Sequence, residues 1–188
     1  TGNFVVDGGT VRLDGNYPTG TDNVALGDTA LDSVQAGGIN NVAIGDHAGT
    51  AITTGDHNTA VGKDALTANT TASRNTAVGM SSLLGTTTGC CNTALGQGTM
   101  AANTDLYKHV ALQDLEYTAI GTLALSTAQT ADNNTAVGYL SLCANTTGAN
   151  NTAVGHLSLL SNTTGTGLVA VGAEALDANT TASYNTAV

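Results

Sequence analysis

The sequence predicts an all-β fold, a parallel β-solenoid or β-roll in which each 17-residue repeat makes one coil. The first observation is a five-residue motif, Asn-Thr-Ala-Val-Gly at residues 58–62, which recurs with small changes from residue 23 onward. The second is the constant interval between motif glycines, which occur at positions 45, 62, 79 and 96 and again at 121, 138, 155 and 172. About ten such coils fit into the chain.

Residues 1–20 do not follow the repeat, and we interpret them as an N-terminal lead-in that caps the first coil. Residues 4–6 and 10–13 are rich in β-branched side chains and predict two short strands, joined by an Asp-Gly-Gly turn. An uncovered end of a solenoid exposes unpaired backbone groups, so a cap is expected there. The repeat region is then residues 21–188.

Each repeat places three alternating positions before its glycine. The position next to the glycine is always a branched aliphatic residue, the middle one is always Ala, and the first is Val or Thr. Alternation of this kind predicts a strand. We expect the Val, Thr and branched aliphatic side chains to fill the coil, and the Ala side chains to face the other way.

An unbroken alanine face lets another backbone approach closely. It therefore predicts a contact with sister chains around an alanine-lined axis; the alternative is a thin coil with the alanines inside and no partner. The axis candidates are Ala43, Ala60, Ala77, Ala94, Ala119, Ala136, Ala153 and Ala170.

A second apolar column lies four residues after the glycine and predicts a second short strand that faces back onto the first. It consists of Leu31, Leu66, Leu83, Met100, Leu125, Leu142, Leu159 and Leu176, and Gly49 interrupts it. The motif glycine makes the turn between the strands, since glycine reaches positive φ without steric cost. The rest of the period is polar and forms the return turn. Helix-pair repeats need more than about 30 residues, which excludes a helical solenoid.

The return turn often contains Asn-Thr-Thr, as at Asn69, Asn145, Asn162 and Asn179. This is a formal glycosylation acceptor. The structural interpretation is stronger, because Asn adopts turn conformations and stacked turns would form asparagine ladders.

The period fails once, because the interval from Gly96 to Gly121 is about half a coil longer than the others. We expect an irregular coil at residues 105–117, with a kink or a protruding feature. Tyr107, Lys108 and His109 cluster there and are the candidate exposed contact.

The composition excludes several classes of function. With a net charge of −10 and four basic residues, the chain is a poor ligand for nucleic acid and for anionic lipid. It has no long apolar run, so no membrane insertion is expected. We find no catalytic set, cofactor motif or metal-ligand pattern, and expect that the chain is not an enzyme. Histidines 47, 57, 109 and 156 occupy different positions of the repeat and predict surface turns. Cysteines 90, 91 and 143 are expected to be free small hydrophobes.

The motif at residues 41–45, Asn-Val-Ala-Ile-Gly, resembles the Ser-Val-Ala-Ile-Gly core of the head repeats of trimeric autotransporter adhesins. That resemblance implies three parallel left-handed β-rolls around a threefold axis, although the period here is longer. The 17-residue form with Asn-Thr-Ala-Val-Gly looks more like repeats in tail-fibre proteins of marine and cyanobacterial phages. Residues 7–18 are also similar to the segment before such repeats. The resemblance covers about residues 22–188.

The resemblance implies the shaft of a homotrimeric phage tail fibre, located on the virion, that projects a distal receptor-binding tip for host attachment. Its partners would be its own copies, other tail or fibre proteins and, through regions outside this chain, a host receptor. The alternative is the head of a trimeric adhesin on a bacterial cell surface that binds host or matrix. The sequence ends inside a motif at residues 185–188, so we expect a piece of something longer.

Overall fold

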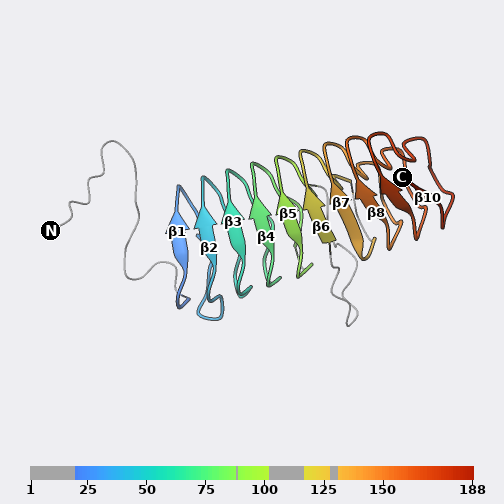
Figure 1. The fold of residues 1–188 in the computed structure, drawn as a ribbon. Coiled ribbons are helices and arrows are strands. Elements are labelled where there is room, and N and C mark those ends of the chain that lie inside the picture. The colour runs from blue at the N-terminus through green and yellow to red at the C-terminus, as the bar shows by residue number, and fades with distance from the viewer. Residues whose placement is uncertain (1–19, 88, 102–116, 128–130) are drawn as a thin grey trace, which may run out of the picture.

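The computed structural model describes residues 20–87, 89–101, 117–127 and 131–188. This part of the chain is all-β, with no helix, and its ten short strands form one sheet in chain order (Figure 1). Every strand pairs in parallel with the next one, so the chain makes a β-solenoid of about nine turns. The predicted fold class is confirmed. The strands are β1 (Val24–Leu26), β2 (Val42–Ile44), β3 (Thr59–Val61), β4 (Thr76–Val78), β5 (Thr93–Leu95), β6 (Tyr117–Ile120), β7 (Asn134–Val137), β8 (Thr152–Val154), β9 (Val169–Val171) and β10 (Thr186–Ala187).

The register of the sheet repeats the register of the sequence. The motif alanines pair with one another, as Ala60 does with Ala77, and the flanking positions pair in the same way. Across the irregular interval, β5 and β6 keep this register and pair Ala94 with Ala119. The extra residues therefore leave the sheet uninterrupted. With strands about 4.8 Å apart, the ten strands extend over about 45 Å.

The second apolar column lies where the sequence placed it, but it does not form a second strand. Leu66 is fully buried, yet it lies in a turn with φ +52°, and Asp64 two residues earlier has φ +57°. The hydrogen bonds still run from coil to coil, since Leu66 N–H donates to Ser82 O at 3.0 Å. The correction has a physical reason: alternate left-handed residues bend this wall back on itself, which an extended strand cannot do in so short a coil.

The motif glycine is required by both its conformation and its neighbours. Gly62 has φ +128°, a region that L side chains rarely adopt. A Cβ atom at this position would lie 2.7 Å from the carbonyl carbon and oxygen of Gly79 in the next coil. The constant length of the coil therefore depends on glycine at this corner.

The alanine side chains face the interior of the coil, so their predicted direction is wrong. Ala43, Ala60, Ala77, Ala94, Ala119, Ala136, Ala153 and Ala170 are at most 1% exposed in a single chain. A Cβ added at Gly49 would lie 3.0 Å from Leu31 Cδ2 and 3.7 Å from Ala43 Cβ, so both side chains face the same interior space. A coil this narrow has room for leucine on one wall only when the facing wall carries a small side chain. The trimer itself stays a prediction, but these alanines cannot line its axis.

Buried asparagines fill the rest of the interior and connect the coils. Asn58 N–H donates to Asn41 Oδ1 at 2.9 Å, and Asn75 N–H donates to Asn58 Oδ1 at 3.0 Å. Asn58 Nδ2 also donates to Ala72 O at 2.9 Å, across its own coil. Each amide therefore satisfies backbone groups that the solenoid interior would otherwise leave unpaired.

The Asn-Thr-Thr turns form a second ladder of this kind. Asn162 Nδ2 donates to Asn145 Oδ1 at 3.1 Å and to Gly165 O at 3.1 Å. Asn69, Asn145 and Asn162 are fully buried. Their structural role is confirmed, and in the folded chain these three side chains are inaccessible to glycosylation. The predicted lead-in strands at residues 4–6 and 10–13 lie outside the described residues.

Candidate interaction surfaces

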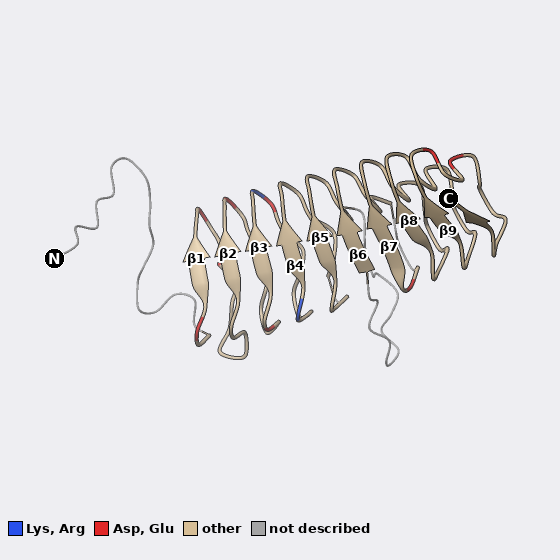
Figure 2. Ribbon diagram, in the orientation of Figure 1, with Lys and Arg blue, Asp and Glu red and all other residues tan. Residues whose placement is uncertain are grey.

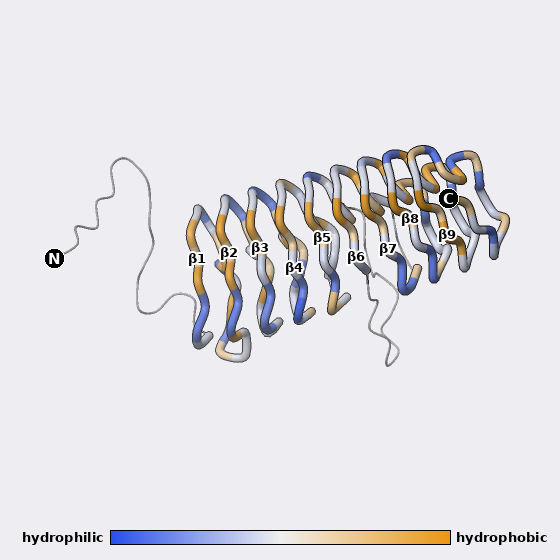
Figure 3. Tube along the Cα trace, in the orientation of Figure 1, coloured by the Kyte–Doolittle hydropathy of each residue, from blue (hydrophilic) through white to orange (hydrophobic). Residues whose placement is uncertain are grey.

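The outward face of the sheet carries two continuous columns of side chains. One column is the Val or Thr position before each alanine, and the other is the branched aliphatic position after it. Aliphatic side chains in these columns are 37–46% exposed at Val24, Ile44, Leu95, Ile120, Val169 and Val171. Figure 3 shows hydrophobic residues following the strands from coil to coil, with hydrophilic residues in the turns below them. We call this surface the outward face.

On the described strands, neither column of the outward face contains a charged residue, although the chain has 14 acidic and four basic residues. Figure 2 shows the charged residues of the described chain in the turns rather than on the strands. The rod is therefore an acidic body with one uncharged, partly apolar side that runs along its length.

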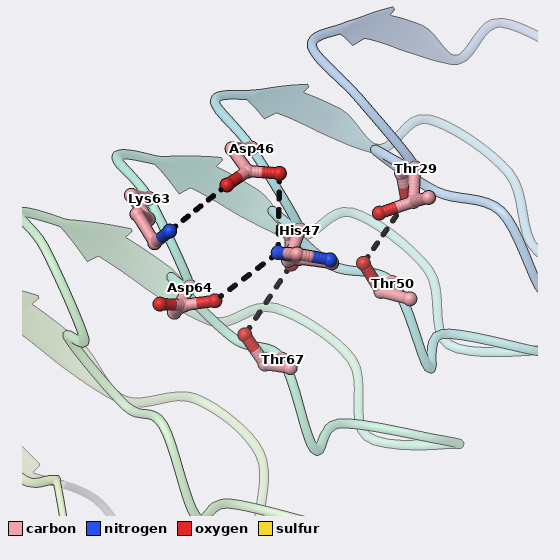
Figure 4. Close-up of polar contacts among 7 residues, drawn as sticks. All are labelled: Thr29, Asp46, His47, Thr50, Lys63, Asp64 and Thr67. Atoms are coloured by element: carbon pink, nitrogen blue, oxygen red, sulfur yellow. Dashed lines mark hydrogen bonds and ion pairs between the residues drawn. The ribbon is translucent and has the colours of Figure 1, made fainter.

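A charged corner follows β2 and β3, at the two positions after the motif glycine (Figure 4). It consists of Asp46, His47, Lys63 and Asp64. Lys63 Nζ lies 3.0 Å from Asp46 Oδ2 in the preceding coil. His47 Nδ1 lies 3.1 Å from Asp46 Oδ1 and 3.5 Å from Asp64 Oδ1. The contacts from Lys63 to Asp46 and from His47 to Asp64 join these two neighbouring coils on the surface of the rod.

The charged corner shifts two pKa values in opposite directions. The hydrogen bond from Lys63 lowers the pKa of Asp46, and the charge of His47 adds to the effect. The same hydrogen bond, together with the charge of Asp46, raises the pKa of Lys63. Both side chains are substantially exposed, so water and salt screen the pair.

The same corner carries mostly apolar and aromatic side chains after β6, β7 and β8, before Glu174 takes the equivalent position after β9. In these three coils it consists of Leu123 after β6, Tyr139 and Leu140 after β7, and His156 and Leu157 after β8. The rings of Tyr139 and His156 are stacked, with centroids 5.6 Å apart and planes 16° from parallel. Tyr139 is 48% exposed and Leu123 is 38% exposed. We call these five residues the ridge.

A shallow polar depression of about 340 Å³ lies where the asparagine ladder is interrupted. Tyr117 occupies the ladder position between Asn92 and Asn134, and Asn92 Oδ1 is buried without a hydrogen-bond partner. Cys90 and Cys91 directly precede Asn92 in the sequence. Both are half-buried, and their sulfur atoms lie 3.1 Å apart. The depression is lined by Cys91, Thr93, Tyr117, Thr118, Asn133, Asn134 and Thr135.

The remaining sequence predictions have mixed outcomes. His47, His57 and His156 lie in turns at or near the surface, as predicted, whereas His109 lies outside the described residues. The candidate contact at Tyr107, Lys108 and His109 also lies outside them and stays a prediction. Among the residues that the structure describes, no three His, Cys, Asp or Glu side chains are grouped to hold a metal ion. No helix in that part of the chain could cross a membrane.

The outward face and the ridge are the surfaces that the sequence-based prediction missed. For the outward face, the signal is the absence of charge from the Val/Thr and aliphatic positions of every repeat. By pattern alone, these uncharged side chains are predicted inside the coil. Comparison with models of known protein families, with curated proteins and with solved structures finds no match in any of the three.

Proposed function

We propose that this chain is the shaft of a homotrimeric fibre of the phage tail-fibre type. Its role is mechanical: the rod holds a distal receptor-binding tip away from the particle. The single sheet supports this role, because every coil is hydrogen-bonded to the next one along about 45 Å. No reaction is proposed for the chain.

The uncharged outward face is the observation that carries the proposal. Two copies of a chain with a net charge of −10 repel each other, and the repulsion is smallest where neither surface carries a charge. Removal of apolar area from water contributes roughly 25 cal/mol per Å². The small free energy gained by burying apolar area at each coil therefore adds up over the ten strands of the sheet.

The repeat also makes this face complementary to itself. Every coil presents the same pair of positions, such as Thr76 and Val78 on β4 or Thr135 and Val137 on β7. Chains that lie side by side in register would therefore meet equivalent residues at each level. In this arrangement the Val, Thr and aliphatic side chains line the trimer axis, in place of the alanines.

The mass of the chain in solution, measured by sedimentation equilibrium, tests the assembly. We expect a trimer for the parent chain. Thr76→Asp places a charge on the outward face and should shift the population to monomer, because three like charges would meet at the axis. The matched control is Thr71→Asp, which adds the same charge in an exposed turn of a neighbouring coil and should remain trimeric. A monomeric parent, or equal masses for both variants, would contradict the proposal.

The gene sequence that flanks the chain tests the kind of fibre. A fibre-tip domain downstream supports the phage assignment. A coiled-coil stalk followed by a membrane anchor would overturn it in favour of a bacterial surface adhesin.

A further inference from the structure

The leucines of the ridge occupy positions where the fold does not require leucine. Leu123, Leu140 and Leu157 have φ between +54° and +58°, in the left-handed region that disfavours side chains other than glycine, Asn and Asp. The equivalent position holds Asp64 after β3 and Ser81 after β4, at nearly the same φ. Polar residues therefore satisfy the backbone at this corner, and the leucines need another explanation.

The aromatic part of the ridge is also partly open to water. Tyr139 stacks on His156 and still leaves 48% of its surface exposed. Tyrosine is enriched among the residues that dominate the energy of protein interfaces, because it combines a large apolar area with few rotatable bonds. An exposed stack of this kind, beside partly exposed leucines, is available for contact with another chain.

The ridge lies directly beside the outward face. Val137 ends β7 on that face, and only Gly138 separates it from Tyr139. The corner carries no Asp, Glu, Lys or Arg at the described positions from Met80 to Leu157. A second copy that approaches the outward face would therefore reach the ridge without meeting a like charge at this corner.

We propose that the ridge is a second chain-to-chain contact, which packs on a neighbouring copy and fixes the axial register of the assembly. This inference rests on the proposed function. The outward face alone repeats at every coil, so a neighbour displaced by one coil would make nearly the same contacts. The ridge occurs over three consecutive coils, after β6, β7 and β8, and is not repeated in the charged corner. A neighbouring chain displaced by one coil would leave part of the ridge uncovered.

The double variant Leu140→Asp/Leu157→Asp tests the proposal. Because Asp64 already occupies this position, the substitutions suit the backbone and the monomer should keep its circular dichroism spectrum. We expect association to weaken on the order of tenfold, which is the effect of losing one significant interface residue. The matched control Ser81→Asp changes the same position outside the ridge and should associate like the parent.

Register is measured by spin labels attached through Thr71→Cys, in a background where the three native cysteines are replaced by serine. The parent should give one interspin distance. The ridge variant should give additional distances that correspond to displacement by one coil, about 4.8 Å along the rod. Tyr139→Thr, with the residue type that Thr122 has at the equivalent position, provides a second variant if the double one misfolds.

The outcomes separate the two proposals. If the ridge variants associate with the parent's affinity and keep one interspin distance while Thr76→Asp dissociates, the ridge inference is wrong and the fibre proposal stands. If the parent chain is itself monomeric, the fibre proposal fails and the ridge inference fails with it.

Discussion

The charged corner and the ridge are the same structural position with different side chains. His47 and Asp64 have φ +57°, and Leu140 and Leu157 have φ +54° and +58°. The backbone is therefore the same in both halves of the rod. In the charged corner the side chains bind one another across coils, through Lys63 and Asp46 at 3.0 Å. In the ridge they stack and leave apolar surface exposed. The comparison shows that the repeat determines the path of the backbone, whereas the side chains at this corner can differ from coil to coil.

The largest expected effect tests whether the backbone is common to both halves. Gly62→Ala, before the charged corner, and Gly138→Ala, before the ridge, should each destabilise the fold by about 3 kcal/mol or more. The added Cβ would lie 2.7 Å from the Gly79 carbonyl in the first variant and would overlap the Gly155 carbonyl oxygen in the second. Urea denaturation measures the loss.

Gly172→Ala is the matched control for these two variants. It has φ +133°, and because the 188-residue chain holds no motif glycine 17 residues further on, its added Cβ would meet nothing closer than 4.0 Å. It should therefore lose only the part of the stability that comes from backbone strain. A Gly62→Ala variant no less stable than Gly172→Ala would show that close approach between coils is not what requires glycine.

The next effect concerns the interior ladder, which both halves also share. Asn58→Ala removes the acceptor of Asn75 N–H and the donor to Ala72 O. Asn151→Ala removes the equivalent bonds to Leu168 and Gly165. The free energy of unfolding of each variant should fall by about 2–4 kcal/mol, because buried backbone groups are left without hydrogen-bond partners. Thr71→Ala, in an exposed turn, should melt like the parent in a thermal scan. A large difference between the two asparagine variants would show that the halves are not equivalent inside.

A smaller effect is expected when the two corners exchange residues. Leu140→Asp should leave the stability of the monomer within about 1 kcal/mol of the parent, or raise it, because Asp tolerates positive φ better than Leu does. Asp64→Leu should lower the stability of the monomer by about 1 kcal/mol or less. Denaturation of dilute, monomeric protein measures both. If Leu140→Asp unfolds the chain, the ridge leucine is a structural residue and the comparison between the corners fails.

The smallest effect is in the surface ion pair. Lys63→Met should return the pKa of Asp46 towards its ordinary value of 3.8, since the hydrogen bond from Lys63 is the main cause of its depression. A lowered carboxyl pKa stabilises the fold above about pH 4 and this contribution is lost as the pH falls through the folded pKa. The raised pKa of Lys63 stabilises the fold below its ordinary value of 10.5, and this contribution is lost as the pH rises through the raised pKa of the folded state. NMR titration of Asp46 measures the change. We expect no detectable change in melting temperature at pH 7.

The sequence by itself determined the solenoid, because period and residue type point to the same structure. A glycine at a constant interval, an invariant alanine two positions earlier and a leucine column four positions later leave little choice of fold. The asparagine ladder of the Asn-Thr-Thr turns was also predicted, since Asn suits turns and stacks well. The ladder of motif asparagines such as Asn58 was not predicted.

Only the tertiary structure decided which side of the strand is inside. An alternating strand has two faces, and Ala60 can fill a narrow interior or accept a close neighbour equally well by pattern alone. The closed coil settles the choice, because Ala60 and Leu66 are both buried inside it, whereas Val61 stays partly exposed. It also replaced the expected second strand by left-handed turns, since the chain must close within a single short repeat. Closure is a property of the whole coil and is not visible in any one segment.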